Sequence, residues 1–434
     1  MMFSRTFKPP LRLSRRGTAY VVAVGIGLMV AAISLGGIAF ARTRAASNHL
    51  RRDEVKARIV SRSAIELARS LITADPSWRS NLSNGTWASG DLLDASYEVS
   101  VTNPSGPLDN SPLDSVVVVG DASVGLARQR LSVQLDAKPV PLNCLAIPMT
   151  VGGAVSAATS TLNPAGATVA TNLGFTSILA TIRPNVEATT VIVGTGFAGT
   201  TSTGLPARTL PSSTVFDSYV SSGTPIAIGS LPVVSLKPTL RRCVLSPASN
   251  PFGATNANGI YVIDCQGQAL VITSCRIVGT LVLLNPGVGT AVTGAVRWEP
   301  AVSNYPCLLV NGNITLQHWS ANLSESTQAT NFNPHGTPYI YPTGTSDSDT
   351  ADSYPSSIAG LVYVSGNVTT SNSPTISLLM IGGSLTLGGT LTLEYDSLYL
   401  NSPPPGFFTV TMTPSPGSWR RVVDEPPESA AIGP

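Results

Sequence analysis

The sequence predicts a mainly β protein with a long N-terminal α-helix: a membrane-anchored helix, a small α/β domain and then a right-handed β-solenoid. Three observations predict this fold class. Residues 18–41 are uncharged, residues 42–75 follow helical periodicity, and from about residue 142 short apolar runs alternate with Gly, Asn, Ser and Pro. Only 12% of the 434 residues are charged, against about 25% in a typical soluble domain.

Residues 18–41 are predicted to form a transmembrane helix. The run has 24 residues, and a helix of this length is about 36 Å long, enough to cross a hydrocarbon core of about 30 Å. Residues 1–17 before it are basic and are predicted to be a cytoplasmic leader. The positive-inside rule alone does not decide the orientation, because arginines also follow the span, from Arg42 to Arg52. A secretory signal peptide is the alternative, because Ile38-Ala39-Phe40-Ala41 resembles a small-residue cleavage site.

Small residues are frequent in this predicted span. Gly25, Gly27, Gly36 and Gly37 lower its intrinsic helix propensity, but small residues on one face let a second helix approach closely. Two interpretations stay open. The helix packs on partner helices through this face, or it is a plain anchor.

The start of the chain carries a resemblance to a known family. Ser14-Arg15-Arg16-Gly17, then Thr18 and an apolar helix that becomes amphipathic, resembles the N-terminus of type IV pilin-like proteins, and most closely PilX-type minor pilins and K-type pseudopilins of type II secretion. The resemblance implies that a prepilin peptidase cuts the Gly17–Thr18 bond. It also implies a glutamate at the fifth mature position, where this chain has Val22.

Residues 42–75 are predicted to continue the helix as a stalk. Ala57, Val60, Ala64, Leu67 and Leu71 follow 3,4,3,4 spacing and share one face, and the helix is expected to end before Pro76. Residues 76–138 are predicted to be a small β domain under this face, because they contain alternating runs such as 96–101 and 131–135. A long helix laid on a few antiparallel strands resembles the pilin plan.

A recurring corner motif predicts the β-solenoid. The pattern is an aliphatic residue, a small residue, Gly, a small residue and an aliphatic residue, and it occurs in four close copies at Val151–Ser156, Val310–Thr315, Val364–Thr369 and Ile381–Thr386. Gly permits a bend between short strands, and stacked copies would bury a continuous core. An irregular β-sandwich is the alternative.

The motif and the loops set the predicted boundaries. Residues 139–245 are predicted to be a linker and a first irregular solenoid part, 246–411 the β-solenoid, and 412–434 a Pro-rich tail. Residues 321–354 are the longest loop expected to leave the coil. Ser418–Val423 are expected to dock back on the solenoid, with Trp419 as the anchor.

The five cysteines form no C-x-x-C pair, so a zinc ribbon or a dithiol redox motif is not expected. Cys265 and Cys275 lie in neighbouring predicted strands. They are interpreted either as a disulfide or as buried thiols.

Neither a catalytic motif nor a cofactor motif is present, so we expect no enzyme activity, no cofactor and no metal. The three histidines, His49, His318 and His335, lie on the stalk, at a strand end and in a turn, respectively. The densest carboxylate cluster, Asp347, Asp349 and Asp352, is a weak Ca²⁺ candidate, and a solvated acidic loop is the alternative.

Charge is distributed unevenly along the chain. Residues 1–80 hold 14 Lys/Arg and 4 Asp/Glu, whereas the remainder holds 12 and 20. The basic part suits anionic lipid head groups, and the acidic remainder argues against nucleic-acid binding.

The expected function is that of a membrane-anchored extracytoplasmic structural protein, a pilin-like component of a pilus or type II secretion assembly that presents a β-solenoid head. Its N-terminus would be cytoplasmic and its bulk periplasmic or extracellular. Its expected partners are membrane lipid, other pilin-like subunits bound through the transmembrane helix, and a surface glycan. The alternative is a tethered polysaccharide-binding or polysaccharide-cleaving β-helix protein, for which Asp264, Arg276, Arg297 and Glu299 are the polar residues near the predicted coils.

Overall fold

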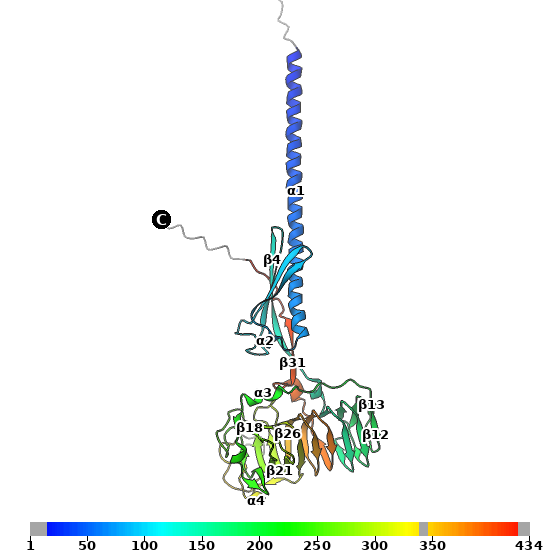
Figure 1. Cartoon of the computed structure of the whole chain (residues 1–434), viewed down its shortest axis with the longest axis vertical. Helices are drawn as coiled ribbons and strands as arrows, with labels where there is room; N and C mark the ends of the chain where they lie inside the picture. The colour runs from blue at the N-terminus through cyan, green and yellow to red at the C-terminus, as the bar shows by residue number, and fades with distance from the viewer. Residues whose placement is uncertain (1–14, 338–345, 424–434) are drawn as a thin grey trace, which may run out of the picture. The chain divides into compact units, whose positions relative to one another are not determined.

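The computed structural model describes residues 15–337 and 346–423 (Figure 1). The chain divides into two compact units. Unit 1 comprises Met1–Lys138 and Thr411–Pro434, and unit 2 comprises Pro139–Val410. Each unit is described by itself below.

Unit 1 consists of one long helix and one antiparallel sheet. Helix α1 runs without interruption over Arg15–Ala74, so the predicted transmembrane segment and stalk are parts of one helix. The short helix α2 (Trp78–Asn81) leads into the sheet, whose first four strands are β1 (Gly85–Leu92), β2 (Ala95–Thr102), β3 (Val116–Val124) and β4 (Ala127–Pro141). Neighbouring strands in this order pair antiparallel.

The C-terminal half of α1 packs on the sheet through a stripe of small and aliphatic side chains. Ala57, Val60, Ala64, Ile65 and Ala68 are all buried. Three of these belong to the predicted 3,4,3,4 stripe, and they face the inward side chains of β3, which alternates buried and half-buried residues along its length. Leu67 is half-buried and Leu71 is exposed, so the buried face is rotated slightly from the predicted one.

The helix and the sheet approach each other closely at Gly120 in β3. A Cβ atom at this position would overlap the backbone oxygen of Ser61 and would lie 3.0 Å from Cγ1 of Ile65. The hydroxyl of Ser61 donates a hydrogen bond of 2.8 Å to the oxygen of Gly120. Glycine therefore sets the distance between α1 and β3.

The C-terminal residues complete the same sheet. Strand β31 (Phe408–Pro414) pairs with β4, and β32 (Arg420–Arg421) pairs antiparallel with Ser132 and Leu131 of β4. The prediction that Ser418–Val423 dock on the solenoid is therefore wrong. These residues lie in unit 1, because β4 offers an open edge that an additional strand can pair with.

Unit 2 is a stack of short parallel strands in three ladders, with three corners per rung. The first ladder, in stacking order, is β14 (Thr224–Pro225), β18 (Ile260–Asp264), β20 (Thr280–Leu284), β22 (Leu308–Asn311), β26 (Ser357–Val364), β28 (Thr375–Ile381), β5 (Met149–Val151), β8 (Thr168–Thr171), β11 (Asn185–Ala188) and β13 (Thr201–Thr203). The second is β16 (Lys237–Arg241), β19 (Val271–Val278), β21 (Ala291–Glu299), β23 (Ile314–His318), β27 (Val368–Thr370), β29 (Leu385–Leu387), β6 (Val155–Ala158), β9 (Phe175–Ile178) and β12 (Ile192–Gly194). The third joins β17 (Val244–Leu245), parts of β19, β21, β26 and β28, then β30 (Thr390–Leu393), β7 (Thr161–Asn163) and β10 (Thr181–Ile182).

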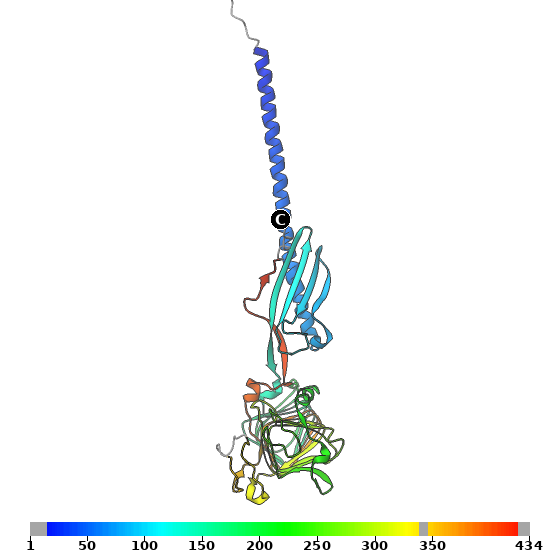
Figure 2. The ribbon, with the colours of Figure 1, turned by 90° about the vertical axis from the view of Figure 1, so that its left-hand side faces the viewer.

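This architecture is solenoid-like, and Figure 2 shows its coils nearly end-on. The β-sandwich alternative is wrong for these residues, because sandwich sheets are antiparallel and these ladders are parallel. Residues 149–203 form rungs of these ladders, and the predicted boundaries of the solenoid parts stay predictions. The predicted right hand of the coil stays a prediction.

The four close copies of the corner motif occupy four consecutive rungs at one corner. Val310 pairs with Val364, Val364 with Ile381, and Ile381 with Val151. Side chains connect the corners, because the amide of Asn367 donates to Oδ1 of Asn313 at 2.7 Å and the amide of Ser384 donates to Oδ1 of Asn367 at 2.8 Å. In the stacking order that begins at Val310 and ends at Val151, a Cβ at the corner glycine of each later copy would overlap the preceding rung. This overlap explains why the position is glycine.

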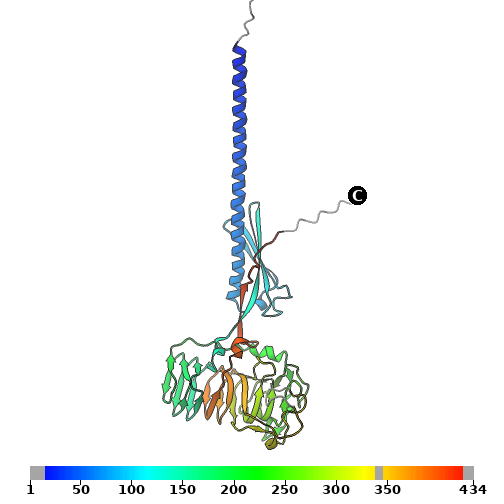
Figure 3. The same cartoon turned by 180° about the vertical axis from the view of Figure 1, so that it is seen from behind.

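The spatial order of these copies differs from their order in the sequence. The chain enters unit 2 in the middle of the stack, builds β5–β13 towards one end, and then runs past α3 (Val215–Val220) to β14 at the other end. It returns rung by rung until β28, β29 and β30 stack on β5, β6 and β7. Figures 1 and 3 show this as orange rungs between teal and green ones.

The first and the last residues of the chain segment that forms unit 2 therefore contact each other. The amide of Leu142 donates to the oxygen of Phe407 at 3.0 Å, and the hydroxyl of Tyr395 donates to the oxygen of Leu145 at 3.0 Å. The 3₁₀ helix at Asn143–Ala146, α3 and α5 (Leu398–Asn401) contribute to a second apolar cluster, which includes outward side chains of β18, β20 and β26. These strands are consequently apolar on both faces.

The remaining described elements lie outside the ladders. They are a 3₁₀ turn (Ile228–Ser230), β15 (Val233–Val234), which pairs antiparallel with β16, and an excursion containing β24 (Leu323–Ser324), α4 (Glu325–Gln328) and β25 (Ser353–Tyr354).

All five cysteines are buried free thiols. The disulfide interpretation of Cys265 and Cys275 is not what the structure shows. Burial raises the pKa of the Cys144 thiol to about 12 and that of Cys265 to about 11, so both are protonated at neutral pH.

Candidate functional site

The N-terminal half of α1 is apolar and uncovered. It is the one described helix long and apolar enough to span a membrane, with a mean hydropathy of 2.4 in its most apolar window, none of which is buried. Tyr20, Met29 and Ile33 are each more than 70% exposed. An apolar helical surface of this length needs a non-aqueous environment, so α1 fits a single-pass membrane anchor near the N-terminus.

Small residues of this segment align on one face. In an α-helix each residue turns by about 100°, so Gly25, Ala32 and Gly36 lie within about 40° of one another. No atom lies within 4 Å of a Cβ added at Gly25 or Gly36. The face is therefore uncovered, which is compatible with both interpretations, partner packing and a plain anchor.

The predicted processing residues Gly17 and Thr18 lie in the first turns of α1. Residues 1–14 of the predicted leader are outside the described residues. Cleavage of the Gly17–Thr18 bond stays a prediction.

The structure brings together three of the four polar residues singled out on the coils. Nη2 of Arg276 lies 2.9 Å from Oε1 of Glu299, and Nη2 of Arg297 lies 3.1 Å from Oε2 of the same carboxylate. The side chains of Arg276 and Glu299 are 0% and 2% exposed. Asp264 is elsewhere, exposed at the end of β18, where it accepts a hydrogen bond from Asn285.

The in-register parallel ladder positions these charges. Arg276 of β19 pairs with Arg297 of β21, and Val278 pairs with Glu299, so residues far apart in sequence are stacked neighbours. The signal in the sequence is a charge inside an otherwise apolar strand, as in VITSCRIV and AVTGAVRWE.

The excursion after β23 covers this cluster. Nη1 of Arg276 donates to the oxygen of Phe332 at 3.1 Å, and its guanidinium lies 5.1 Å from the ring centre of Tyr354. The carboxylate of buried Glu325 accepts from the amide of Phe332 and, at 3.1 Å, from the amide of Asp352. Arg276 thus holds the excursion on the coil, and Glu325 holds the excursion together from within. Both Arg276 and Glu299 are buried beneath it.

The three aspartates of the Ca²⁺ candidate lie in this excursion. Asp352 accepts from Nδ2 of Asn333 at 2.6 Å, and Oδ1 of Asp347 accepts from the amide of Asp349 at 3.2 Å. Among the described residues, no group of three His, Cys, Asp or Glu side chains is arranged to hold a metal ion. These carboxylates shape the loop through hydrogen bonds.

The histidines are dispersed. His49 is exposed on α1, and His335 is exposed with Nδ1 3.3 Å from Oγ of Ser346. His318 is fully buried at the end of β23, where its Nε2 accepts from the amide of Thr375 at 3.1 Å. Burial lowers the pKa of His318 to about 4.

We expect His318 to make unit 2 sensitive to acid. Its folded pKa lies below the unfolded value of about 6.5, so the unfolded chain binds the proton more readily, and the stability is present above pH 6.5 and lost as the pH falls towards 4. The loss attributable to this residue is about 3 kcal/mol between pH 7 and pH 4. Urea unfolding at both pH values would measure it. His318→Gln should show a smaller fall, and His335→Gln should behave as the parent.

No protein-family model matches the chain, and no curated protein sequence matches it. Among solved structures, the chain is similar to the competence-associated pilin ComZ from Thermus thermophilus, with a TM-score of 0.29 and 10% sequence identity. The match covers 85% of this chain and 98% of that one. At this TM-score the likeness assigns neither fold nor function.

Proposed function

We propose that the chain is a membrane-anchored extracytoplasmic structural protein, a pilin-like subunit of a pilus or type II secretion assembly, with a right-handed β-solenoid as its exposed head. One observation carries the proposal. A single helix is bare and apolar in its first half and packed on an antiparallel sheet in its second half. The motif Ser14–Thr18 at its start supports the same family.

Assembly would occur through the open face of Gly25, Ala32 and Gly36, which suits close contact with neighbouring subunits. Lipid would contact the rest of the apolar segment, and the Ser/Thr/Asn-rich surface of unit 2 would bind a partner or a surface glycan. The alternative of a polysaccharide-cleaving enzyme gains no support from the described residues, because their acidic and basic cluster on the coil is buried beneath the excursion.

The experiment is fractionation of cells that express the full chain, followed by N-terminal sequencing of the membrane-bound protein. We expect a mature protein that begins at Thr18 and stays in the membrane fraction. Gly17→Leu should leave the leader attached, whereas the matched change Gly27→Leu, inside the span, should not affect cleavage. A protein that begins at Met1 or after Ala41, or that is freely soluble in the cytosol, would contradict the proposal.

A further inference from the structure

A basic groove lies in unit 1 between α1 and the edge of the sheet. It has a volume of about 600 Å³ and is lined by Glu54, Val55, Arg58, Arg62, Gln129, Leu131, Trp419, Arg420 and Arg421. Four of these residues are arginines and one is a glutamate. The groove exists because the chain leaves the edge of β4 after β31 and returns to it only at β32, with Trp419 between them.

The arginines of the groove present their charge to the outside. Arg58, Arg62, Arg420 and Arg421 are all exposed, and within residues 15–337 and 346–423 none of them forms an ion pair with a carboxylate. Arg62 lies 5.5 Å from the ring centre of Trp419, which fixes one wall of the groove. A cluster of four exposed guanidinium groups attracts carboxylates and binds them bidentately.

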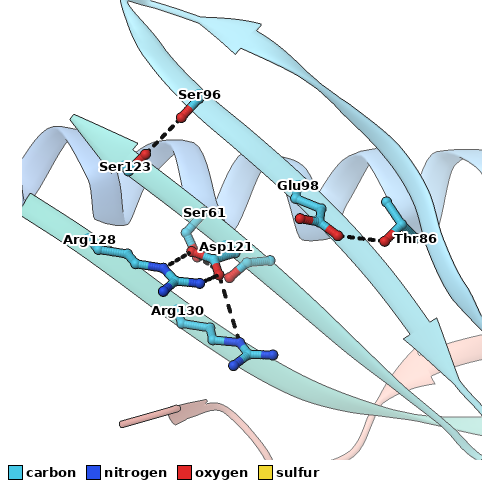
Figure 4. A network of polar contacts seen from close by, with 9 residues as sticks. Ser61, Thr86, Ser96, Glu98, Asp121, Ser123, Arg128 and Arg130 are labelled. Atoms are coloured by element: carbon cyan, nitrogen blue, oxygen red, sulfur yellow. Dashed lines mark hydrogen bonds and ion pairs between the residues drawn. The ribbon is translucent and has the colours of Figure 1, made fainter. Parts of the chain in front are cut away.

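The basic edge continues onto the outer face of the sheet. Figure 4 shows Arg128 and Arg130 of β4 both directed towards Asp121 of β3. Arg128 Nε donates to Oδ1 of Asp121 at 3.0 Å, and Arg130 Nε lies 3.9 Å from Oδ2. Two arginines thus approach one carboxylate on this side of the sheet.

The opposite edge of the same sheet is acidic. Hairpin β1–β2 contains Asp91, Asp94 and Glu98 and no Lys or Arg. The carboxylate of Asp94 is 97% exposed and lies 3.2 Å from Nζ of Lys56 on α1. Since Lys56 lies within the helical span Glu54–Arg62 that lines the groove, the acidic and basic edges are at the same level along α1.

Membrane lipid does not suit this groove. The apolar run ends at Ala41, and Glu54 and Arg62 lie about 20 and 30 Å further along the continuous helix. The head-group layer extends only about 5–8 Å beyond the hydrocarbon core. The ligand must therefore be presented by something that stands above the membrane at the level of unit 1.

We infer that the basic groove of one copy binds the acidic β1–β2 hairpin of a second copy. Complementary patches on opposite edges of one sheet give a heterologous contact, in which each subunit donates its hairpin to one neighbour and receives a hairpin from the other. Such a contact propagates into a ring or a helical filament. The inference rests on the proposed function, because the membrane anchor must hold neighbouring copies side by side.

Cysteine crosslinking of the full chain in membranes tests this contact. The native thiols are buried, so introduced cysteines would react first. We expect Asp91→Cys combined with Arg420→Cys to give a ladder of dimers, trimers and larger species on oxidation. Each single variant should give no dimer, and co-expression of the two single variants should give dimers that do not extend. As a matched control, Asp109→Cys with Arg420→Cys should give no ladder. Asp109 lies beyond the end of α1 and away from the level of the groove, because the backbone oxygen of the preceding residue, Leu108, accepts a hydrogen bond from Arg79.

Charge variants test the chemistry of the contact. Arg58→Glu with Arg421→Glu should lower the ladder yield at least fivefold, and adding Glu98→Arg should restore part of it. Removal of residues 424–434 should leave the ladder intact. If the ladder is lost on that removal, the acidic tail makes the contact and the inference is wrong. If a lipid phosphate fills the groove instead, no 91–420 crosslink should form, and that result would also overturn the inference.

A crosslink inside the membrane separates this inference from the proposed function. Ala32→Cys lies on the exposed face that also contains Gly25 and Gly36. If Ala32→Cys crosslinks neighbouring copies but the 91–420 pair does not, copies assemble through the helix and the groove contact is wrong. If neither Ala32→Cys nor the 91–420 pair crosslinks, the proposed assembly itself is wrong.

Discussion

Replacing Gly120 by valine is expected to separate the C-terminal half of α1 from the sheet of unit 1. A Cβ at this position would overlap the backbone oxygen of Ser61 and press on Ile65. A helix backbone atom cannot rotate away as a side chain can, so α1 must shift as a body. Overpacking a core costs about 1–3 kcal/mol, and loss of the Ser61–Gly120 hydrogen bond adds about 1 kcal/mol. The total is therefore about 2–4 kcal/mol.

Hydrogen exchange of the full chain in detergent would measure this effect. In Gly120→Val, protection should fall for residues 57–72 of α1 and for β3. Gly90→Val is the matched control in the same sheet, because a Cβ there meets only the ring of Tyr97 at an ordinary 3.4 Å. Ser61→Ala removes the hydrogen bond without a clash and should cost about 1 kcal/mol. Unchanged protection in Gly120→Val would contradict the close contact described here.

Local patterns predicted the elements that depend on local sequence. The spacing of Ala57, Val60 and Ala64 identified a buried helical face because a helix repeats every 3.6 residues whatever it packs against. The corner motif identified stacked rungs for a similar reason. Each corner needs glycine where its backbone approaches the rung below, so the same pattern returns at every rung.

The order of the rungs could not be predicted in this way. The copy at Val151 comes first in the chain, yet it stacks on Ile381, after the other three copies. Every copy has nearly the same pattern of aliphatic and small residues, so any one fits on any other, and only the path of residues 204–224 decides their order. The uneven sequence spacing of the copies indicated long loops but not a stack that starts in its middle.

Two features of the candidate sites could not be predicted, because each depends on a neighbouring strand that the local sequence does not reveal. The alternation in Phe408–Pro414 is typical of an edge strand, but the free edge of β4 that accepts it is visible only in the folded sheet. Arg276, Arg297 and Glu299 were identified as polar residues near the coils, and only the ladder register shows that they meet. In both cases the residues in contact are far apart in the sequence, and no local periodicity relates one to the other.

Replacing Glu299 by glutamine is expected to destabilise unit 2 far more than the same change in a partly exposed ion pair. Glu299 is the carboxylate that faces the 0% exposed Arg276 and also binds Arg297. Glutamine keeps the shape but removes the charge, so Arg276 would stay buried with its cation poorly compensated. Breaking a buried pair by removing one partner costs about 3–5 kcal/mol, which corresponds to a fall of about 10 °C in Tm for a unit of this size.

Glu187→Gln is the matched control in the same unit. Glu187 pairs with Arg208 at 2.7 Å, but the two side chains are 29% and 20% exposed, so water can replace the lost charge and the cost should be about 1 kcal/mol or less. Limited proteolysis gives a second readout. Because Arg276 binds Phe332 and stacks on Tyr354, loss of its counter-charge should loosen the excursion, and cleavage within residues 319–356 should become faster in Glu299→Gln only. Equal Tm values and equal cleavage rates in the two variants would show that the buried cluster does not hold the excursion on the coil.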